Sequence, residues 1–206
     1  MNNNQGKTTQ LTAIAIGVIM ALVLVAMFWL LIAPRFAATE SPAQTQTAQQ
    51  AYQQALSVAQ NWQPDAQLSR VTASWQPQNK ININGLKDGR ANWAFTFYSP
   101  TTHQTSIIAV NGNQAHQSRF DHPIHPPSLI HLDQWIIDSP VAIQTFLTYG
   151  GQEFLQNWPQ ASIHLKLAVN EQQTVEWQII GITNPTNSIL FFLNATTGIV
   201  GDGTIG

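Results

Sequence analysis

Residues 92–98 read NWAFTFY, and this heptapeptide decides which kind of fold the sequence predicts. Trp93, Phe95 and Phe97 alternate with other residues, so an extended chain places the three aromatic rings on one side. A strand with one aromatic face needs a helix or a second sheet to cover that face. The segments on either side predict such a cover.

The neighbouring segments predict one helix and two further strands. Residues 48–62 (AQQAYQQALSVAQNW) repeat apolar residues at intervals of three and four, with glutamines between them, which is typical of an amphipathic helix. Residues 66–75 and 105–110 (TSIIAV) have the alternation of strands, and Asn111-Gly112 ends the second of these. The first half of the chain therefore predicts one helix followed by three strands.

The same order of features recurs in the second half. Asp138-Ser139-Pro140 predicts a helix start, because a side-chain oxygen can accept from first-turn amides and proline has no amide to satisfy. We expect this helix to break at Gly150-Gly151. Glu176-Trp177-Gln178-Ile179 then corresponds to Asn92-Trp93-Ala94-Phe95, and residues 188–193 (SILFFL) follow as a return strand. We expect an α+β fold with two repeated α-β-β-β units, each a helix packed on an antiparallel sheet.

The expected organisation divides the chain into consecutive segments. They are a short cytoplasmic head (1–10), a transmembrane helix (11–33), a linker (34–47), a first unit (48–112), an inter-unit linker (113–137), a second unit (138–200) and a flexible tail (201–206). The tail matches G-x-G-x-x-G literally, but no segment follows it that could form the phosphate-binding helix of a dinucleotide fold.

Two elements of the second half resemble a known family. Trp177-Gln178-Ile179 begins one predicted strand, and residues 191–200 (FFLNATTGIV) run from an apolar strand into a turn at Thr197-Gly198. This pattern resembles the PepSY-type domain, best over residues 139–200 and more faintly over residues 48–112. The resemblance implies cystatin-like units in an extracytoplasmic or membrane-tethered protein, and a role as an inhibitory or regulatory segment that accompanies a protease. It brings no catalytic residues, and this chain has few acidic residues on the final strand.

Residues 11–33 (LTAIAIGVIMALVLVAMFWLLIA) contain no charged residue. A helix of this length rises about 1.5 Å per residue and extends over roughly 34 Å, which is enough to cross a hydrocarbon core. We expect a span from Leu11 to Ala33 that includes Gly17 and Trp29. The stretch exceeds the apolar region of a cleaved signal peptide, so an uncleaved anchor is favoured. The expected location is the cell membrane, with a single pass and the carboxyl-terminal domain outside the cytoplasm.

Composition narrows the classes of partner. Charged residues make up 9% of the chain, hydrophobic residues make up 44%, and the formal net charge is −2. Nucleic-acid binding is excluded, because it requires clustered lysine or arginine. The chain has no cysteine, which excludes a lipid anchor attached through that residue. The apolar stretch implies the lipid bilayer as one partner, and the resemblance to the PepSY-type domain implies an envelope protein or protease as the other.

The densest group of chemically capable side chains lies in the expected inter-unit linker. His116, His122, His125 and His131 occur there with Asp121 and Asp133 nearby, and imidazole with carboxylate is a ligand set for zinc or copper. The surrounding prolines are typical of an extended linker, and the histidine spacing matches no metal motif. We therefore expect no metal and no cofactor, with these four histidines as the alternative.

No pattern for nucleophilic catalysis is present, since the sequence lacks cysteine, G-x-S-x-G and Ser-x-x-Lys. We therefore expect a protein that is not an enzyme. Trp75 and Trp135 have no counterpart in the repeat and are the aromatic residues to test for surface exposure. The tryptophans at paired repeat positions are expected in the core: Trp62, Trp93, Trp158 and Trp177.

These observations predict a membrane-anchored, extracytoplasmic, non-catalytic binding domain that binds or regulates a protease or another envelope protein. Two alternatives remain open. One is a structural or assembly component that acts through its membrane span, and the other is a metal-binding envelope domain that uses the histidines. Exposed strand edges are the most general binding device of such a sheet, because they can accept an extended peptide.

Overall fold

The computed structural model of the chain describes residues 45–76, 82–184, 187–201 and 203–205. The expected head, span and most of the first linker lie outside the described residues. Among the residues that are described, no helix is both long and apolar enough to cross a membrane. The prediction of a span therefore stays a prediction.

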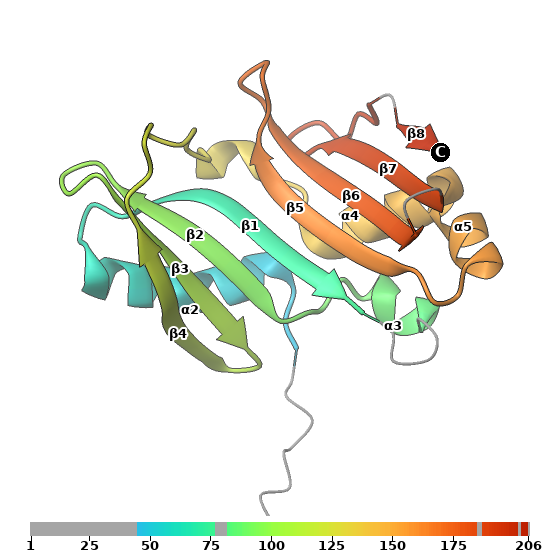
Figure 1. Ribbon diagram of the computed structural model, residues 1–206, viewed down its shortest axis with the longest axis horizontal. Coiled ribbons are helices and arrows are strands. Elements are labelled where there is room, and N and C mark those ends of the chain that lie inside the picture. The colour runs from blue at the N-terminus through green and yellow to red at the C-terminus, as the bar shows by residue number, and fades with distance from the viewer. Residues whose placement is uncertain (1–44, 77–81, 185–186, 202, 206) are drawn as a thin grey trace, which may run out of the picture. The chain divides into compact units, whose positions relative to one another are not determined.

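One antiparallel sheet of eight strands organises the described chain (Figure 1). The strands are β1 (Gln67–Trp75), β2 (Trp93–Ser99), β3 (Gln104–Asn111), β4 (Gln114–Asp121), β5 (Ser162–Val169), β6 (Val175–Asn184), β7 (Asn187–Asn194) and β8 (Thr204–Ile205). Their order across the sheet is β4-β3-β2-β1-β5-β6-β7-β8. The first half of the chain therefore supplies β1 to β4 on one side of the sheet, the second half supplies β5 to β8 on the other side, and β1 and β5 join them.

Helices cover one face of this sheet, and in Figure 1 α2 and α4 lie behind the strands. The helical elements are α2 (Ala48–Trp62), α3 (Ile83–Lys87), η1 (Leu132–Gln134), α4 (Ser139–Phe146), η2 (Leu147–Gly151) and α5 (Gln152–Asn157). The buried positions of α2 are alanines except for Tyr52, so the helix can lie close to the sheet. The Tyr52 ring centroid lies 6.1 Å from that of Phe95 and 5.7 Å from that of Trp135.

The α+β fold class and the antiparallel sheet are confirmed. Trp93, Phe95 and Phe97 all face the helices and are at most 2% exposed. Aromatic burial of this size dominates a core, because each ring removes a large apolar area from water. The alternation in residues 92–98 thus identified the most buried strand of the first half.

The sheet differs from the expectation in two ways. We expected a separate sheet for each unit, but β1 pairs with β5 from Val71–Leu167 to Trp75–Ile163, so the sheet is continuous. Residues 114–121, expected within the inter-unit linker, form β4 and pair with β3. Seven of the eight β4 residues are exposed, so this edge strand lacks the alternation that would have revealed it.

Trp93 in β2 and Trp177 in β6 make equivalent hydrogen bonds. The Trp93 Nε1–H donates to the Gln46 carbonyl oxygen at 2.7 Å, and the Trp177 Nε1–H donates to the Ile137 carbonyl oxygen at 2.8 Å. Gln46 lies two residues before the start of α2, as Ile137 does before α4. The two indole centroids are 6.4 Å apart. Each tryptophan therefore fixes the approach of one helix while it packs against the other tryptophan.

The amino-terminal ends of α2 and α4 meet at Asp138 and Ser139. Asp138 Oδ1 accepts from the backbone amides of Ser139 at 2.7 Å and Gln49 at 3.0 Å. The buried Ser139 Oγ accepts from the Ala48 amide at 3.0 Å and donates to the Gly89 carbonyl oxygen at 2.7 Å. The predicted helix start at residues 138–140 is confirmed. One carboxylate and one hydroxyl thus satisfy first-turn amides of both helices.

The predicted break at Gly150-Gly151 is also confirmed. After α4 the chain forms a π-helical turn, η2, in which Gly150 has a φ of 105°. Tyr149 and Gly150 both have non-helical backbone angles, so the chain kinks between α4 and α5. Trp158, which was expected in the core, lies after this kink and is 42% exposed, so its assignment to the core is wrong.

The other tryptophans lie at different depths. Trp135 is only 5% exposed, and its ring centroid is 6.1 Å from that of Trp177. Trp75 is half-buried against Trp93, and its Nε1–H donates to the Arg90 carbonyl oxygen at 3.2 Å. Trp62 is likewise half-buried against the core. Trp75 and Trp135, which the sequence marked for a test of surface exposure, are therefore both packed against the core.

Asp65 connects the end of α2 to the turn between β2 and β3. Its carboxylate accepts from the Thr101 backbone amide at 2.8 Å and from the Ser99 hydroxyl at 2.7 Å. Hydrogen bonds from Thr101 and Ser99 stabilise the ionised carboxylate and hold the pKa of Asp65 below its usual value. The turn is therefore held by a charge-assisted contact that protonation weakens.

This contact predicts a pH dependence of stability. A lowered folded-state pKa adds stability above the unfolded-state value of about 3.9, and that stability is lost as pH falls through the folded-state pKa. We expect Asp65→Asn to lower the urea midpoint at pH 7 and to reduce the loss of stability on acidification below about pH 4. Urea unfolding at several pH values measures both effects. The control is Asp133→Asn, because the Asp133 side chain is exposed. If Asp65→Asn and the wild type lose the same amount of stability on acidification, the lowered pKa of Asp65 does not contribute to stability.

Candidate functional site

The face of the sheet opposite the helices, which we call the uncovered face, carries no helix in the described part of the chain (Figure 1). Alternation along each strand sends apolar residues to the helix side and other residues to the uncovered face. In β5, Ile163 and Leu165 are at most 1% exposed, whereas His164 and Lys166 are half-buried. The uncovered face is therefore a mixed polar and apolar surface.

A row of paired residues crosses this face. The strand registers align Ala109 in β3, Ala94 in β2, Thr72 in β1, Lys166 in β5 and Gln178 in β6. Small side chains occupy the strands of the first half, and long side chains occupy those of the second half. The uncovered face is therefore lower over the strands of the first half and higher over those of the second half, with the change in height where β1 pairs with β5.

A hollow of about 530 Å³ lies at this step. Its walls include the small residues Thr72, Ser74, Ala94 and Ala109 and the polar residues Asn92, Asn111, His164 and Lys166. Within the described chain, these last four side chains form no hydrogen bond or ion pair, so their donors and acceptors are available to a ligand. Polar side chains that line a concave surface and have no partner within the chain are typical of a binding site.

A second hollow of about 490 Å³ continues the first, and Gln178 lines both. Glu171 and Glu176 line this second hollow. The charge along the uncovered face thus changes sign, from Lys166 in the first hollow to these two glutamates in the second. A bound segment that carries an acidic group and a basic group at matching positions would find an opposite charge for each.

The four histidines of the metal hypothesis do not come together. His116 lies in β4, and His122, His125 and His131 follow along the exposed segment that leads to η1. In the described ranges, no three His, Cys, Asp or Glu side chains are grouped so that they could hold a metal ion. His122 instead contacts Gln104, with 2.8 Å between the two Nε2 atoms.

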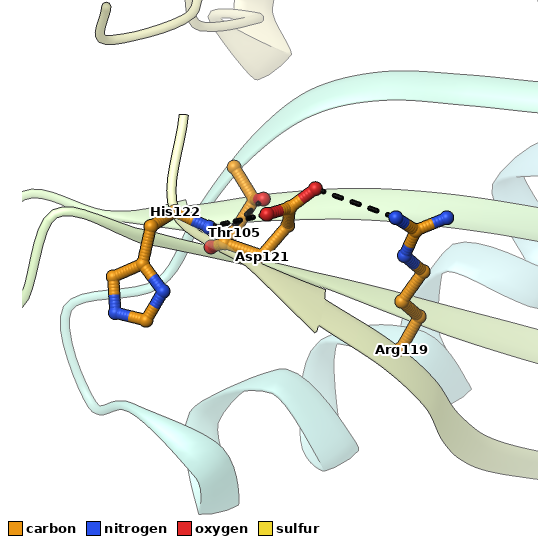
Figure 2. Close-up of polar contacts among 4 residues, drawn as sticks. All are labelled: Thr105, Arg119, Asp121 and His122. Atoms are coloured by element: carbon orange, nitrogen blue, oxygen red, sulfur yellow. Dashed lines mark hydrogen bonds and ion pairs between the residues drawn. The ribbon is translucent and has the colours of Figure 1, made fainter. Parts of the chain in front are cut away.

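Asp121 is occupied by contacts at the end of β4 (Figure 2). Its Oδ2 lies 3.5 Å from Arg119 Nη2, and its Oδ1 accepts from the His122 amide at 2.8 Å. Its carbonyl oxygen accepts from the Thr105 hydroxyl at 3.4 Å. The Arg119 and Asp121 side chains are 70% and 65% exposed, so their ion pair adds little stability. The carboxylate is thus engaged along its own strand.

Part of the carboxyl-terminal tail pairs with the sheet. Residues 204–205 form β8 and pair with Ile189 and Leu190 of β7. The Gly201 amide donates to the Phe192 carbonyl oxygen at 3.1 Å. The prediction of a flexible tail over residues 201–206 stays a prediction, and the structure adds that the edge of β7 pairs with part of this segment.

Comparisons with known proteins identify no family. No protein-family model matches this sequence, and no curated protein matches it. One solved structure with a similar fold is that of a "putative lipoprotein" from Clostridium difficile 630. The two chains are 10% identical, the match covers 76% of this chain and 93% of the other, and the TM-score is 0.49.

Proposed function

We propose that this protein is a membrane-anchored, extracytoplasmic, non-catalytic domain that binds another envelope protein through the uncovered face of its sheet. The carrying observation is the pair of adjoining hollows, lined by available polar groups and by charges of both signs. An extended or looped segment of a partner fits such a shallow, elongated surface better than a small enclosed ligand does.

Equivalent contacts in the two halves support a construction from two PepSY-like units. The indoles of Trp93 and Trp177 donate to carbonyl groups at the same distance before α2 and α4. The turns after β3 and β7 each contain a glycine with positive φ, 58° at Gly112 and 73° at Gly198. The family resemblance implies a protease, or a protein regulated with one, as the class of partner.

The predicted anchor sets where the partner must be. Residues 11–33 supply the proposed span, and only residues 34–44 separate it from the described domain. At full extension these eleven residues reach roughly 40 Å. The proposed partner is therefore an envelope protein with a segment exposed close to the membrane surface.

The proposal predicts that changes on the uncovered face reduce partner recovery. Ala109→Arg fills the first hollow, and Lys166→Glu reverses its charge. We expect each variant to lower the amount of partner recovered with the full-length chain from crosslinked membranes by about tenfold, which corresponds to about 1.4 kcal/mol. Quantitative mass spectrometry after affinity purification measures the loss.

A matched variant on the helix side controls for charge and expression. Gln53 lies on the exposed side of α2, away from the sheet, so Gln53→Arg should leave recovery unchanged. Recovery at wild-type levels from both Ala109→Arg and Lys166→Glu would contradict binding through the uncovered face. An equal loss in Gln53→Arg would instead place the binding surface on the helices.

A further inference from the structure

The two ends of the sheet differ in what covers them. At one end β7 is followed by β8 and by the backbone contact between Gly201 and Phe192. At the other end β4 (Gln114–Asp121) pairs with β3 alone. Within the described residues, β4 is therefore the long strand with one side unpaired, and its outer amides and carbonyls can accept another strand.

The side chains at the end of β4 do not protect this edge in the usual way. Edge strands commonly carry charges that repel a second copy of the same strand. Here Arg119 and Asp121 have opposite charges and flank Phe120, whose side chain is 64% exposed. Phe120 pairs with buried Ser106 and so shares the helix side of the sheet, whereas the two charged residues share the uncovered side.

We propose that β4 pairs antiparallel with β4 of a second copy of this chain, with Phe120 opposite Phe120 of the partner subunit. In this register Arg119 lies opposite the partner's Asp121, and Asp121 lies opposite the partner's Arg119. Directly opposite residues in an antiparallel pair share a face, so the two phenylalanine rings meet on the helix side. The contact is isologous, since one strand supplies both sides of it.

Neighbouring registers of the same kind are disfavoured. A pairing centred on Arg119 places two arginines opposite each other, and a pairing centred on Asp121 places two aspartates opposite each other. Like charges at directly opposite positions destabilise a strand pair. Pro123 has no amide, so the pairing extends only from Ser118 to His122 in each copy. Among the registers centred on residues 119 to 121, only the one centred on Phe120 places opposite charges together.

This contact is short and is expected to be weak in dilute solution, because stable interfaces bury roughly 1,200 Å² or more. Anchoring both copies in one membrane raises their effective concentration without any new contact. The gain in effective concentration depends on the membrane anchor of the proposed function. The register of the β4 pair does not depend on it. The test therefore uses the full-length chain in membranes.

Disulfide trapping tests the register directly, because the chain contains no cysteine. Opposite Cα atoms in an antiparallel pair are about 4.5–5.5 Å apart, which is within the range of about 4.4–6.8 Å found in disulfides. We expect Phe120→Cys to form a covalent dimer under mild oxidation at least about ten times faster than Ser118→Cys. In the proposed register the two Ser118 positions are offset by about 13 Å along the strands.

Charge exchange supplies the second test. In the Phe120→Cys chain, Asp121→Arg should slow dimer formation, and a further Arg119→Asp should restore it. Equal trapping of Phe120→Cys and Ser118→Cys would overturn the proposed register, as would failure of the second charge change to restore the rate. Residues 118–121 line neither hollow, so changes there should not affect partner binding through the uncovered face. If the wild-type register is not trapped but the envelope partner is still recovered normally, only the proposed self-pairing is overturned, and the proposed function stands.

Discussion

Replacing Trp177 with alanine is expected to lower the free energy of unfolding by roughly 3–5 kcal/mol. The Trp177 side chain is fully buried and packs against Trp93 and Trp135. Its removal also takes away one of the two indole donors to the half-buried Ile137 carbonyl oxygen, which keeps the hydrogen bond from Trp135 Nε1–H at 3.1 Å. A small domain has only about 5–15 kcal/mol of stability, so this loss should be visible as a large shift of the urea midpoint.

The same experiment tests whether the two halves form one cooperative structure. Because β1 pairs with β5 and the two tryptophans touch, Trp93→Ala should shift a single transition for the entire domain. Trp158 is 42% exposed, so Trp158→Ala is the control and should cost less than about 1.5 kcal/mol. Two separated transitions in Trp93→Ala, with one of them unshifted, would contradict a shared core.

Replacing Gly89 with alanine is expected to lower the free energy of unfolding by roughly 3 kcal/mol. Gly89 has a φ of +58°, and an added Cβ would lie 2.4 Å from the Pro140 backbone nitrogen and 2.6 Å from the Ser139 carbonyl carbon. These atoms begin α4 and are held by the Ser139 hydrogen bonds to Gly89 and Ala48. The start of α4 therefore cannot move away from Gly89 without breaking these two hydrogen bonds.

Gly198→Ala provides the matched control for this prediction. Gly198 also has positive φ, +73°, but an added Cβ would meet only Ile137 Cδ1, at 3.2 Å. Backbone strain without a backbone clash should cost only about 1–2 kcal/mol. Thermal unfolding of both variants gives the comparison. Equal costs would show that the contact between Gly89 and the start of α4 adds nothing beyond the strain of a left-handed residue.

Sequence patterns predicted the elements that have one buried side or a distinctive end. The aromatic alternation of Trp93, Phe95 and Phe97 required a cover, and the alanine-rich stripe of residues 48–62 predicted a helix that supplies it. Asp138 predicted a helix start because capping is local chemistry that needs no knowledge of the rest of the fold.

Other features depend on contacts between distant segments, which periodicity does not encode. Residues 162–169 (SIHLKLAV) alternate clearly, but this pattern does not say that β5 will pair with β1 rather than end a separate sheet. His164 and Lys166 form part of the candidate site only because that pairing places them beside the small residues of the first half. The hollow therefore arises from the pairing of β5 with β1 and not from a pattern within β5 alone.

The most direct test of binding through the uncovered face is site-specific photocrosslinking in intact membranes. A photoreactive amino acid is introduced at Ala109, Ser74 or Gln178 on the uncovered face and, as the control, at Gln53 on α2. The proposed function predicts that the three positions on the uncovered face all crosslink to the same envelope protein and that Gln53 does not. Crosslinks to that protein from Gln53, with none from the three positions on the uncovered face, would contradict it.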